Sequence, residues 1–453
     1  MQDDTLASSR TDFVHNAGGL RTSETQHLTS VELTPEFLLP SSSKQAARPL
    51  MGWLAVGLFA ITAFAEPDEE ALGKAKGYPR GTAATMYAEP FKVGSFSAAD
   101  KILPSRLVTR GGPVTPLTNG APATINYRYQ NTRCGLDDYL EHQRVTGLLI
   151  LKDGAIVAER YRYGRSERDR FLSFSVAKSV TSLLAGIALE KGVLASLDDP
   201  AEKHVAELKE SGYGRATIRQ LLRMSSGVKF TEEYNGRDDI ARLSRAERSG
   251  EPGAALQLLA SLNERAFPAG EKFGYASSEP AVLGYVLARA ARRNIAELTR
   301  EWLWQPLGAE ADAAWIISAD GQEGTEGRFN AALRDYGRLG LLLARDGNIG
   351  GRQIVPREYL LDATDPTRQP PAFRPRAATP YFGYGYLFWL LPMRHRTFAM
   401  LGIYGQSVLV QPDSGIVVAQ TSVNKDPRAT QTRAERDAFW RGVLESLGGY
   451  VEP

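Results

Sequence analysis

A serine and a lysine stand three residues apart near the start of an apolar stretch, "FLSFSVAKSVTSLLAGIALEKG", at residues 171–192. On a helix this spacing places Ser175 and Lys178 on one face, one turn apart. Burial penalises the charged ammonium, and a neutral lysine can accept the proton of a serine hydroxyl. A serine at a helix start also places its backbone N–H among the unpaired donors of the first turn, where an oxyanion is stabilised. The pair predicts a nucleophile with its own general base.

The Ser-x-x-Lys spacing by itself is unspecific, since it occurs four times in the chain. One other pair lies in the polar leader, one spans Gly227 at an expected helix end, and one follows an expected strand. Only the pair at Ser175 opens a buried helix after a hairpin. The alternative interpretation is an ordinary lysine at position 178 whose ammonium reaches out of the core.

A second group of polar residues, Tyr275-Ala276-Ser277, lies in a short segment before another apolar helix. Tyr275 could relay a proton to a leaving group, and Ser277 could support it by hydrogen bonding. The alternative is a packed tyrosine with its hydroxyl at the surface.

Other catalytic arrangements have less support. The chain has five histidines and no Gly-x-Ser-x-Gly elbow, which disfavours a Ser-His-Asp hydrolase, although triad members need only meet in space. We interpret the acidic pairs Asp198-Asp199 and Glu232-Glu233 as solvated loop charges, which offer no basis for a glycosidase.

The elements around these residues predict an α+β fold. Residues 145–164 contain two strand-like runs joined by Asp153-Gly154, a tight-hairpin signal. Residues from about 196 to 345 have mostly helical periodicity, and strand-like runs return between 384 and 423 before a terminal helix. We expect an antiparallel sheet flanked by helices, with an inserted all-helical lobe at about 196–345.

Composition excludes several classes of protein. The 453 residues carry a formal net charge of +2 with both signs mixed, so no nucleic-acid partner is expected. The one cysteine, Cys134, cannot form an intramolecular disulfide, and no Cys/His cluster has metal-ligand spacing. No Gly-rich phosphate loop is present, and no metal or cofactor is expected.

The N-terminal 135 residues fall into three segments that differ in amino-acid composition. Residues 1–50 are expected to be a disordered leader or the product of a mis-assigned start, and residues 51–65 a signal peptide ending in a small-x-small site. Export to the periplasm or the medium follows, with a non-cleaved membrane anchor as the alternative. Residues 66–135 are expected to be an irregular segment that wraps the body and carries no functional signal. Residues 136–453 would form the catalytic domain.

Ser175-Val176-Ala177-Lys178, Tyr275-Ala276-Ser277 and the late strand-like run "LGIYGQSVLV" occur in this order, with supporting stretches such as "MSSGVKFTEEY" and "FGYGYLFWL". Over roughly residues 130–448 the chain resembles the serine beta-lactamase and penicillin-binding protein superfamily, class C branch. Within that superfamily, its motifs are most similar to those of the 6-aminohexanoate-dimer hydrolase group. The resemblance implies a beta-lactamase/transpeptidase-like fold with the site between a sheet lobe and a helical lobe.

The resemblance also implies roles for individual residues. Ser175 would form an acyl-enzyme, Lys178 would be the general base and Tyr275 its proton-relay partner. The oxyanion hole would use the backbone N–H groups of Ser175 and Ile403, the latter on a strand expected at 402–406. Further substrate contacts are expected from three side chains: Tyr234, which would close over the substrate or be only a surface aromatic, Ser277 and Tyr404.

One departure from that superfamily concerns the late strand. Beta-lactamases and penicillin-binding enzymes place Lys-Thr/Ser-Gly there, whereas this chain has Gly402-Ile403-Tyr404-Gly405, with neither a cation nor an aliphatic hydroxyl to bind a penicillin carboxylate. A serine hydrolase of small amides or esters is therefore expected. A D-alanyl-D-alanine carboxypeptidase or weak class C beta-lactamase, and a non-catalytic binding protein on the same fold, remain the alternatives.

Overall fold

The structure is a computed structural model that describes residues 69–452. The expected leader (1–50) and signal peptide (51–65) lie outside the described residues. Within residues 69–452, none of the helices has both the length and the apolar character needed to cross a membrane.

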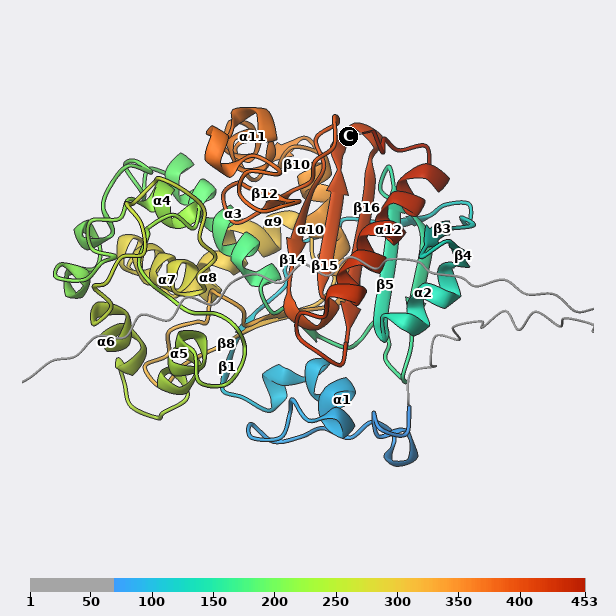
Figure 1. The fold of residues 1–453 in the computed structure, drawn as a ribbon, viewed down its shortest axis with the longest axis horizontal. Helices are drawn as coiled ribbons and strands as arrows, with labels where there is room; N and C mark the ends of the chain where they lie inside the picture. Colours follow the sequence, from blue (N-terminus) through green and yellow to red (C-terminus); the bar gives the residue numbers. More distant parts are fainter. Residues whose placement is uncertain (1–68, 453) are drawn as a thin grey trace, which may run out of the picture. The chain divides into compact units, whose positions relative to one another are not determined.

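The largest sheet has eight strands in the order β12-β13-β14-β15-β16-β5-β6-β2 (Figure 1). All neighbours are antiparallel except β2, which runs parallel to β6. The strands are β2 (Thr118–Asn119), β5 (Val145–Lys152), β6 (Ala155–Tyr161), β12 (Gly383–Tyr384), β13 (Trp389–Leu390), β14 (Phe398–Leu401), β15 (Ser407–Gln411) and β16 (Ile416–Ser422). The expected hairpin is β5-β6, and its turn residues Asp153 and Gly154 have the positive φ values, 53° and 86°, that a tight hairpin turn requires.

Both faces of this sheet are covered by helices. On β5, Leu148 and Ile150 belong to an apolar cluster shared with α2 (Leu136–His142) and α12 (Thr430–Ser446). The alternate residues Leu149 and Leu151 belong to the main core, shared with α3 (Val176–Glu190) and α10 (Leu333–Ala344). Because successive side chains point to opposite faces of a strand and both faces are covered, β5 has a continuous apolar run, Leu148 to Leu151.

The helical lobe lies beside the sheet in Figure 1. Its helices are α4 (Ile218–Leu222), α5 (Asp239–Glu247), α6 (Ala254–Ala260), α7 (Ser278–Ala291), α8 (Ile295–Leu298) and α9 (Gln305–Leu307). Two strands, β8 (Ala313–Ile316) and β9 (Phe329–Ala331), also fall within the stretch expected to be all-helical. The chain returns to the large sheet at α10, where a Cβ on Gly340 would lie 2.3 Å from Val417 Cγ1. The described lobe is thus mostly, but not entirely, helical.

A second sheet joins distant parts of the chain in the order β1-β8-β9-β7. It pairs β1 (Ser105–Val108) of the N-terminal segment with β8, and β7 (Phe171–Leu172) with β9. The strand β7 ends directly before the start of α3. The smaller elements are α1 (Lys92–Phe96), α11 (Arg357–Thr364), the hairpin β3 (Asn126–Tyr129) and β4 (Thr132–Gly135), and the hairpin β10 (Asn348–Ile349) and β11 (Arg352–Gln353).

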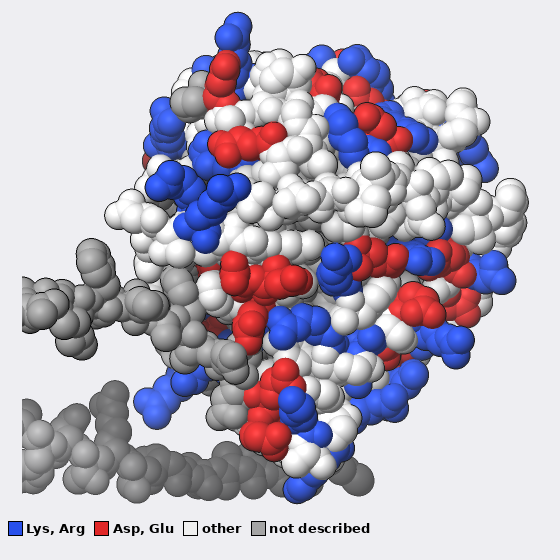
Figure 2. All heavy atoms as spheres, turned by 90° about the vertical axis from the view of Figure 1, so that its right-hand side faces the viewer, with Lys and Arg blue, Asp and Glu red and all other residues white. Residues whose placement is uncertain are grey.

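Charged side chains of both signs are interspersed on the molecular face drawn in Figure 2. The face lies on the side of α12 and α2 (Figure 1), and neither positive nor negative side chains predominate on it. This distribution agrees with the formal net charge of +2.

A buried ion pair on α10 ties three segments together. Arg338 donates hydrogen bonds to Asp335 Oδ1 at 2.9 Å, to Glu310 Oε2 at 2.8 Å and to the carbonyl of Thr115 at 2.9 Å. Asp335 in turn accepts from the backbone N–H groups of Glu310 and Ala311. The Arg338 side chain is 2% exposed and that of Asp335 is 0% exposed, so neither charge has solvent as a substitute partner.

We expect Arg338→Ala to lower the free energy of unfolding by about 3–5 kcal/mol, because it leaves the Asp335 carboxylate buried without its cation. Arg334→Ala is the matched control, since Arg334 lies on the same helix and pairs with Glu159 but is 35% exposed. Arg334→Ala should lower the free energy of unfolding by about 0–1 kcal/mol. Urea denaturation of both variants measures the difference, and equal losses would contradict the anchoring role of Arg338.

Candidate active site

Strand β7 and helix α3 hold Ser175 at the helix start. The backbone N–H of Ser173 donates to the carbonyl of Phe329 at 2.8 Å, which fixes the approach to the helix. Phe174 has a φ of 45°, in the left-handed region that a bulky side chain rarely adopts. Ser175 then occupies the N-cap position, half-buried, and within residues 69–452 its backbone N–H donates to no acceptor.

Lys178 lies one turn into α3 and faces Ser175. Its Nζ donates to Ser175 Oγ at 2.9 Å and to the carbonyl of Glu326 at 2.5 Å. The residue is 2% exposed and forms no ion pair with a carboxylate of residues 69–452. Burial therefore lowers the pKa of Lys178, and the more distant carboxylates of Glu232, Glu326 and Glu247 oppose this only in part. The arrangement places a weakly basic amine against a serine hydroxyl.

Tyr275 is the third member of the group. The Lys178 Nζ lies 5.3 Å from the centre of its ring, and the ring stacks on Trp389 at 5.6 Å between centroids. Burial and the nearby Glu232 carboxylate raise the pKa of Tyr275, while a hydrogen bond with the Ser175 side chain acts to lower it. The phenol is thus a neutral hydroxyl directed at Ser175, able to pass a proton on.

Ser277 and Tyr234 both bind a carboxylate that the sequence analysis placed in solvent. Glu232 is 8% exposed. It accepts hydrogen bonds from Ser277 Oγ at 2.8 Å, from the Ser277 backbone N–H at 2.7 Å and from Tyr234 Oη at 2.5 Å. The interpretation of Glu232 as a solvated loop charge was wrong, because two of these three hydrogen bonds come from Ser277, which lies 45 positions away in the sequence. Ser277 is therefore bonded to Glu232 instead of to Tyr275.

The residues expected to form a strand at 402–406 instead form a 3-10 turn, Ile403–Gly405, between β14 and β15. The reason is local, since Tyr404 has a φ of 61°, which a strand cannot contain. At Gly402 a Cβ would lie 2.6 Å from the carbonyl oxygen of Ser173, so this backbone passes directly beside the residues that precede Ser175. The ring of Tyr404 lies 5.3 Å from that of Phe174.

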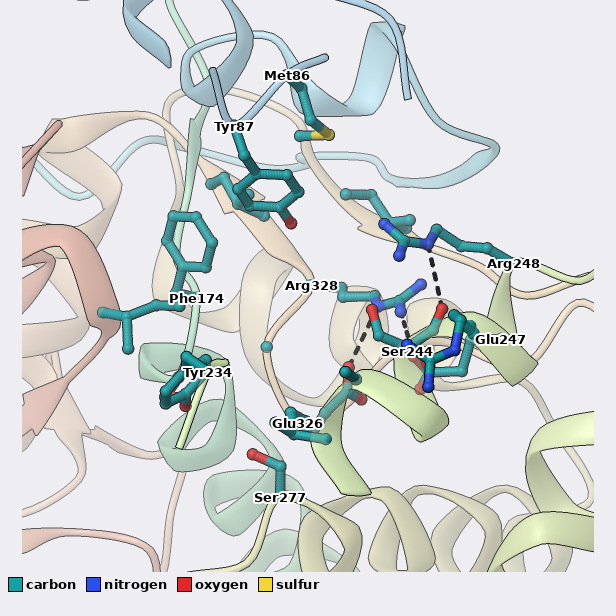
Figure 3. A pocket seen from close by; sticks show the side chains of 18 of the residues that line it. Met86, Tyr87, Phe174, Tyr234, Ser244, Glu247, Arg248, Ser277, Glu326 and Arg328 are labelled. Carbon is teal, nitrogen blue, oxygen red and sulfur yellow. Dashed lines mark hydrogen bonds and ion pairs between the residues drawn. The ribbon is translucent and has the colours of Figure 1, made fainter. Parts of the chain in front are cut away.

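Ser175 lines a cavity of about 410 Å³. Figure 3 shows side chains that surround this cavity. Its lining includes five of the residues proposed from sequence: Ser175, Tyr234, Ser277, Ile403 and Tyr404. Lys178 and Tyr275 stand behind Ser175 and do not line it. A volume of this size matches a small-molecule site.

The N-terminal segment supplies a wall of the cavity that the sequence did not reveal. Met86, Tyr87 and Leu103 line the cavity, and the ring of Tyr87 lies 6.4 Å from the rings of both Phe174 and Tyr404. Figure 3 shows the Tyr87 side chain reaching into the space beside Phe174. No local pattern in residues 66–135 marks this role.

Charged residues form the opposite wall. Arg328 pairs with Glu247 and, at 3.2 Å, with Glu326 (Figure 3). Burial raises the pKa of Glu247 to about 8, although Arg328 acts against the increase. Within residues 69–452 no group of three or more His, Cys, Asp or Glu side chains could hold a metal ion.

Comparisons with known proteins identify the family of this chain. The beta-lactamase family matches residues 136–439. A 6-aminohexanoate-dimer hydrolase from Paenarthrobacter ureafaciens is 26% identical over 389 residues, which cover 83% of this chain and 94% of that protein.

Solved structures show the same fold. A candidate 6-aminohexanoate-dimer hydrolase from Bacillus anthracis superposes with a TM-score of 0.71 at 19% identity, covering 85% of this chain and 99% of the other. A penicillin-binding protein from Bacillus halodurans gives a TM-score of 0.54 at 18% identity, covering 67% and 99%. The beta-lactamase/transpeptidase-like α+β fold predicted from the sequence is confirmed. The chain belongs to the beta-lactamase family and is a hydrolase of this serine-type superfamily, similar to 6-aminohexanoate-dimer hydrolases.

Proposed function

We propose that the chain cleaves a small amide or ester through an acyl-enzyme formed on Ser175. The observation that carries the proposal is the buried Lys178, whose Nζ lies 2.9 Å from Ser175 Oγ and forms no ion pair with a carboxylate of residues 69–452. A buried amine with a lowered pKa is the form of lysine that can act as a base near neutral pH.

Acylation begins with transfer of the Ser175 hydroxyl proton to neutral Lys178. In the neutral amine one N–H continues to bind the carbonyl of Glu326, and the lone pair is directed at Ser175. The Oγ forms a bond to the substrate carbonyl carbon, and the carbonyl oxygen takes the negative charge. The unpaired N–H of Ser175 and the N–H of Ile403 are the proposed donors to that oxyanion.

The leaving group departs with a proton. As the tetrahedral intermediate collapses, the C–N or C–O bond breaks and Tyr275 passes the leaving atom a proton that Lys178 replaces. A water molecule then attacks the acyl-enzyme, gives a proton back through the same pair and releases the carboxylic acid and Ser175. The Glu232 carboxylate holds Ser277 and Tyr234 in place around this path.

Small esters and linear amides are the proposed substrates. The relative from Paenarthrobacter ureafaciens is named for a linear amide, the 6-aminohexanoate dimer. The turn at Ile403–Gly405 offers no cation for the carboxylate of a penicillin. Nitrocefin should therefore be the poorest substrate in a comparison with p-nitrophenyl esters and 6-aminohexanoate dimer.

Ser175→Ala and Lys178→Ala should each reduce kcat/KM for p-nitrophenyl butyrate by at least about 10³-fold, since residues that act as one unit fail together. Steady-state rates and mass-spectrometric detection of a phosphonate adduct on Ser175 measure this. Lys191→Ala is the control, because Lys191 is exposed at the other end of α3. Turnover that survives Ser175→Ala would remove the proposal.

The pH profile should follow the ionisation of Lys178. Only its neutral form accepts a proton, so kcat/KM should rise with pH and level off above a pKa that burial lowers from the ordinary 10.5. Glu232→Gln removes a carboxylate that raises this pKa, and the rising limb should move to lower pH. An unmoved limb in Glu232→Gln, with Ser175 labelling intact, would exclude Lys178 as the titrating base.

Gly402→Ala should lower kcat by about tenfold to a hundredfold with little change in KM, because its Cβ would push the Ile403 N–H away from the oxyanion. Ile403→Val keeps the backbone N–H and should retain wild-type kcat. If Ile403→Val lost as much activity as Gly402→Ala, the side chain rather than the backbone would be the important group.

A further inference from the structure

One face of helix α5 lines the cavity in front of Ser175. Ala241, Ser244, Arg245 and Arg248 recur at the spacing that places side chains on one helical stripe, and all four line the cavity. The helix begins at an Asp238 N-cap, whose carboxylate accepts from the backbone N–H groups of Glu233, Tyr234 and Ala241. The cap fixes the direction in which this stripe faces.

The acidic groups of the cavity are already engaged. The Asp238 carboxylate is used by backbone N–H groups, and those of Glu247 and Glu326 pair with Arg328. The second oxygen of Glu326 is fully buried, without a hydrogen-bond partner in residues 69–452, and is therefore out of reach of a ligand in the open cavity. None of these carboxylates is free to bind a cationic substrate.

Arg245 and Arg248 are not paired with a carboxylate of residues 69–452. Arg245 Nη1 donates to the carbonyl of Gly236 at 3.0 Å, and Arg248 Nε donates to the carbonyl of Ser244 at 3.1 Å (Figure 3). Neither guanidinium forms an ion pair with a carboxylate of residues 69–452, and both residues are exposed. Both arginines line the same cavity as Arg328 and Tyr87.

Much of the remaining lining is apolar. It includes Leu172, Phe174, Ile240, Ile316 and, from the N-terminal segment, Met86. A ligand that fits both surfaces has an aliphatic or aromatic middle and a negative end.

The position of the proton donors determines which part of the substrate occupies the cavity. A leaving atom must meet Tyr275 or Lys178 to receive its proton, and neither residue lines the cavity. The leaving group therefore departs on the side of Tyr275, and the cavity is left for the acyl group. This assignment rests on the function proposed above.

We propose that Arg245 and Arg248 select acyl groups with a terminal carboxylate, so that the substrate class is half-esters or half-amides of aliphatic dicarboxylic acids. The apolar lining holds the methylene chain and the guanidiniums bind the free carboxylate. Ser175 attacks the other, esterified or amidated carbonyl, and the alcohol or amine leaves with its proton.

Three esters with six-carbon acyl chains distinguish the effect of terminal charge from the effect of chain length. They are p-nitrophenyl hexanoate, mono-p-nitrophenyl adipate and p-nitrophenyl 6-aminohexanoate. We expect kcat/KM for the adipate ester to exceed that of hexanoate by about tenfold and that of the ammonium ester by more, as for charge-assisted contacts at a partly exposed site. The preference should weaken as salt is raised.

The double variant Arg245→Gln/Arg248→Gln should lose the adipate preference and keep its rate with hexanoate. Arg245→Glu should move the preference toward the 6-aminohexanoate ester. Arg242→Gln is the control, because Arg242 lies on the same helix, pairs with Asp239 and does not line the cavity. It should behave as the wild type.

The outcomes separate this inference from the proposed function. Hydrolysis of hexanoate through Ser175 with no adipate preference, or with a preference that survives the double variant, overturns the arginine assignment and leaves the serine mechanism standing. No turnover of any of the three esters, together with no phosphonate labelling of Ser175, overturns both.

Discussion

The chemistry proposed for the site depends on the burial of one amine. Lys178 lies in the first turn of α3, and that helix is enclosed between the large sheet and the helical lobe, so its ammonium has little access to water and forms no ion pair with a carboxylate of residues 69–452. Such a position costs stability unless the proton can be given up, and the lowered pKa of the side chain is the direct result. The same enclosure fixes Ser175 at the start of the helix. The packing around α3 thus supplies the burial on which the proposed chemistry depends.

Contacts between segments that are distant in sequence fix the backbone on both sides of Ser175. Strand β7 enters the second sheet beside β9, and this pairing directs the chain into α3 with Phe174 in a left-handed conformation. The turn at Gly402, which connects β14 and β15 of the other sheet, passes close to the Ser173 carbonyl. The Glu326 carbonyl that binds Lys178 comes from the loop before β9. Ser175 and Lys178 are close in sequence, but the groups that contact them or their approach, in β9, at Glu326 and at Gly402, come from distant segments.

This division explains what could be predicted from the sequence. A hairpin at Asp153-Gly154, a buried helix after Ser175 and the pairing of Ser175 with Lys178 are set by contacts over a few residues, so periodicity and spacing find them. Glu232 could not be found this way, because nothing near it reveals that Ser277 will enclose it. The turn at Ile403–Gly405 was expected as a strand, since the apolar pattern of β14 and β15 continues across it and the left-handed φ of Tyr404 leaves no mark in the sequence. Tyr87 was missed for the same reason, because its partners Phe174 and Tyr404 lie on other elements.

Selectivity and chemistry are carried by separate parts of the chain. The groups that would move protons stand on α3 and before α7, in the packed centre, where a substitution disturbs many neighbours at once. The cavity walls come from α5 and from the N-terminal segment, whose side chains at Tyr87, Arg245 and Arg248 are largely exposed. Exposed side chains can be exchanged at little cost in folding free energy, whereas buried ones cannot. A chain built in this way can change its acyl group by changing surface residues while the serine and lysine stay as they are, so the charge of the cavity wall, rather than the reactive pair, is the feature from which the substrate should be inferred.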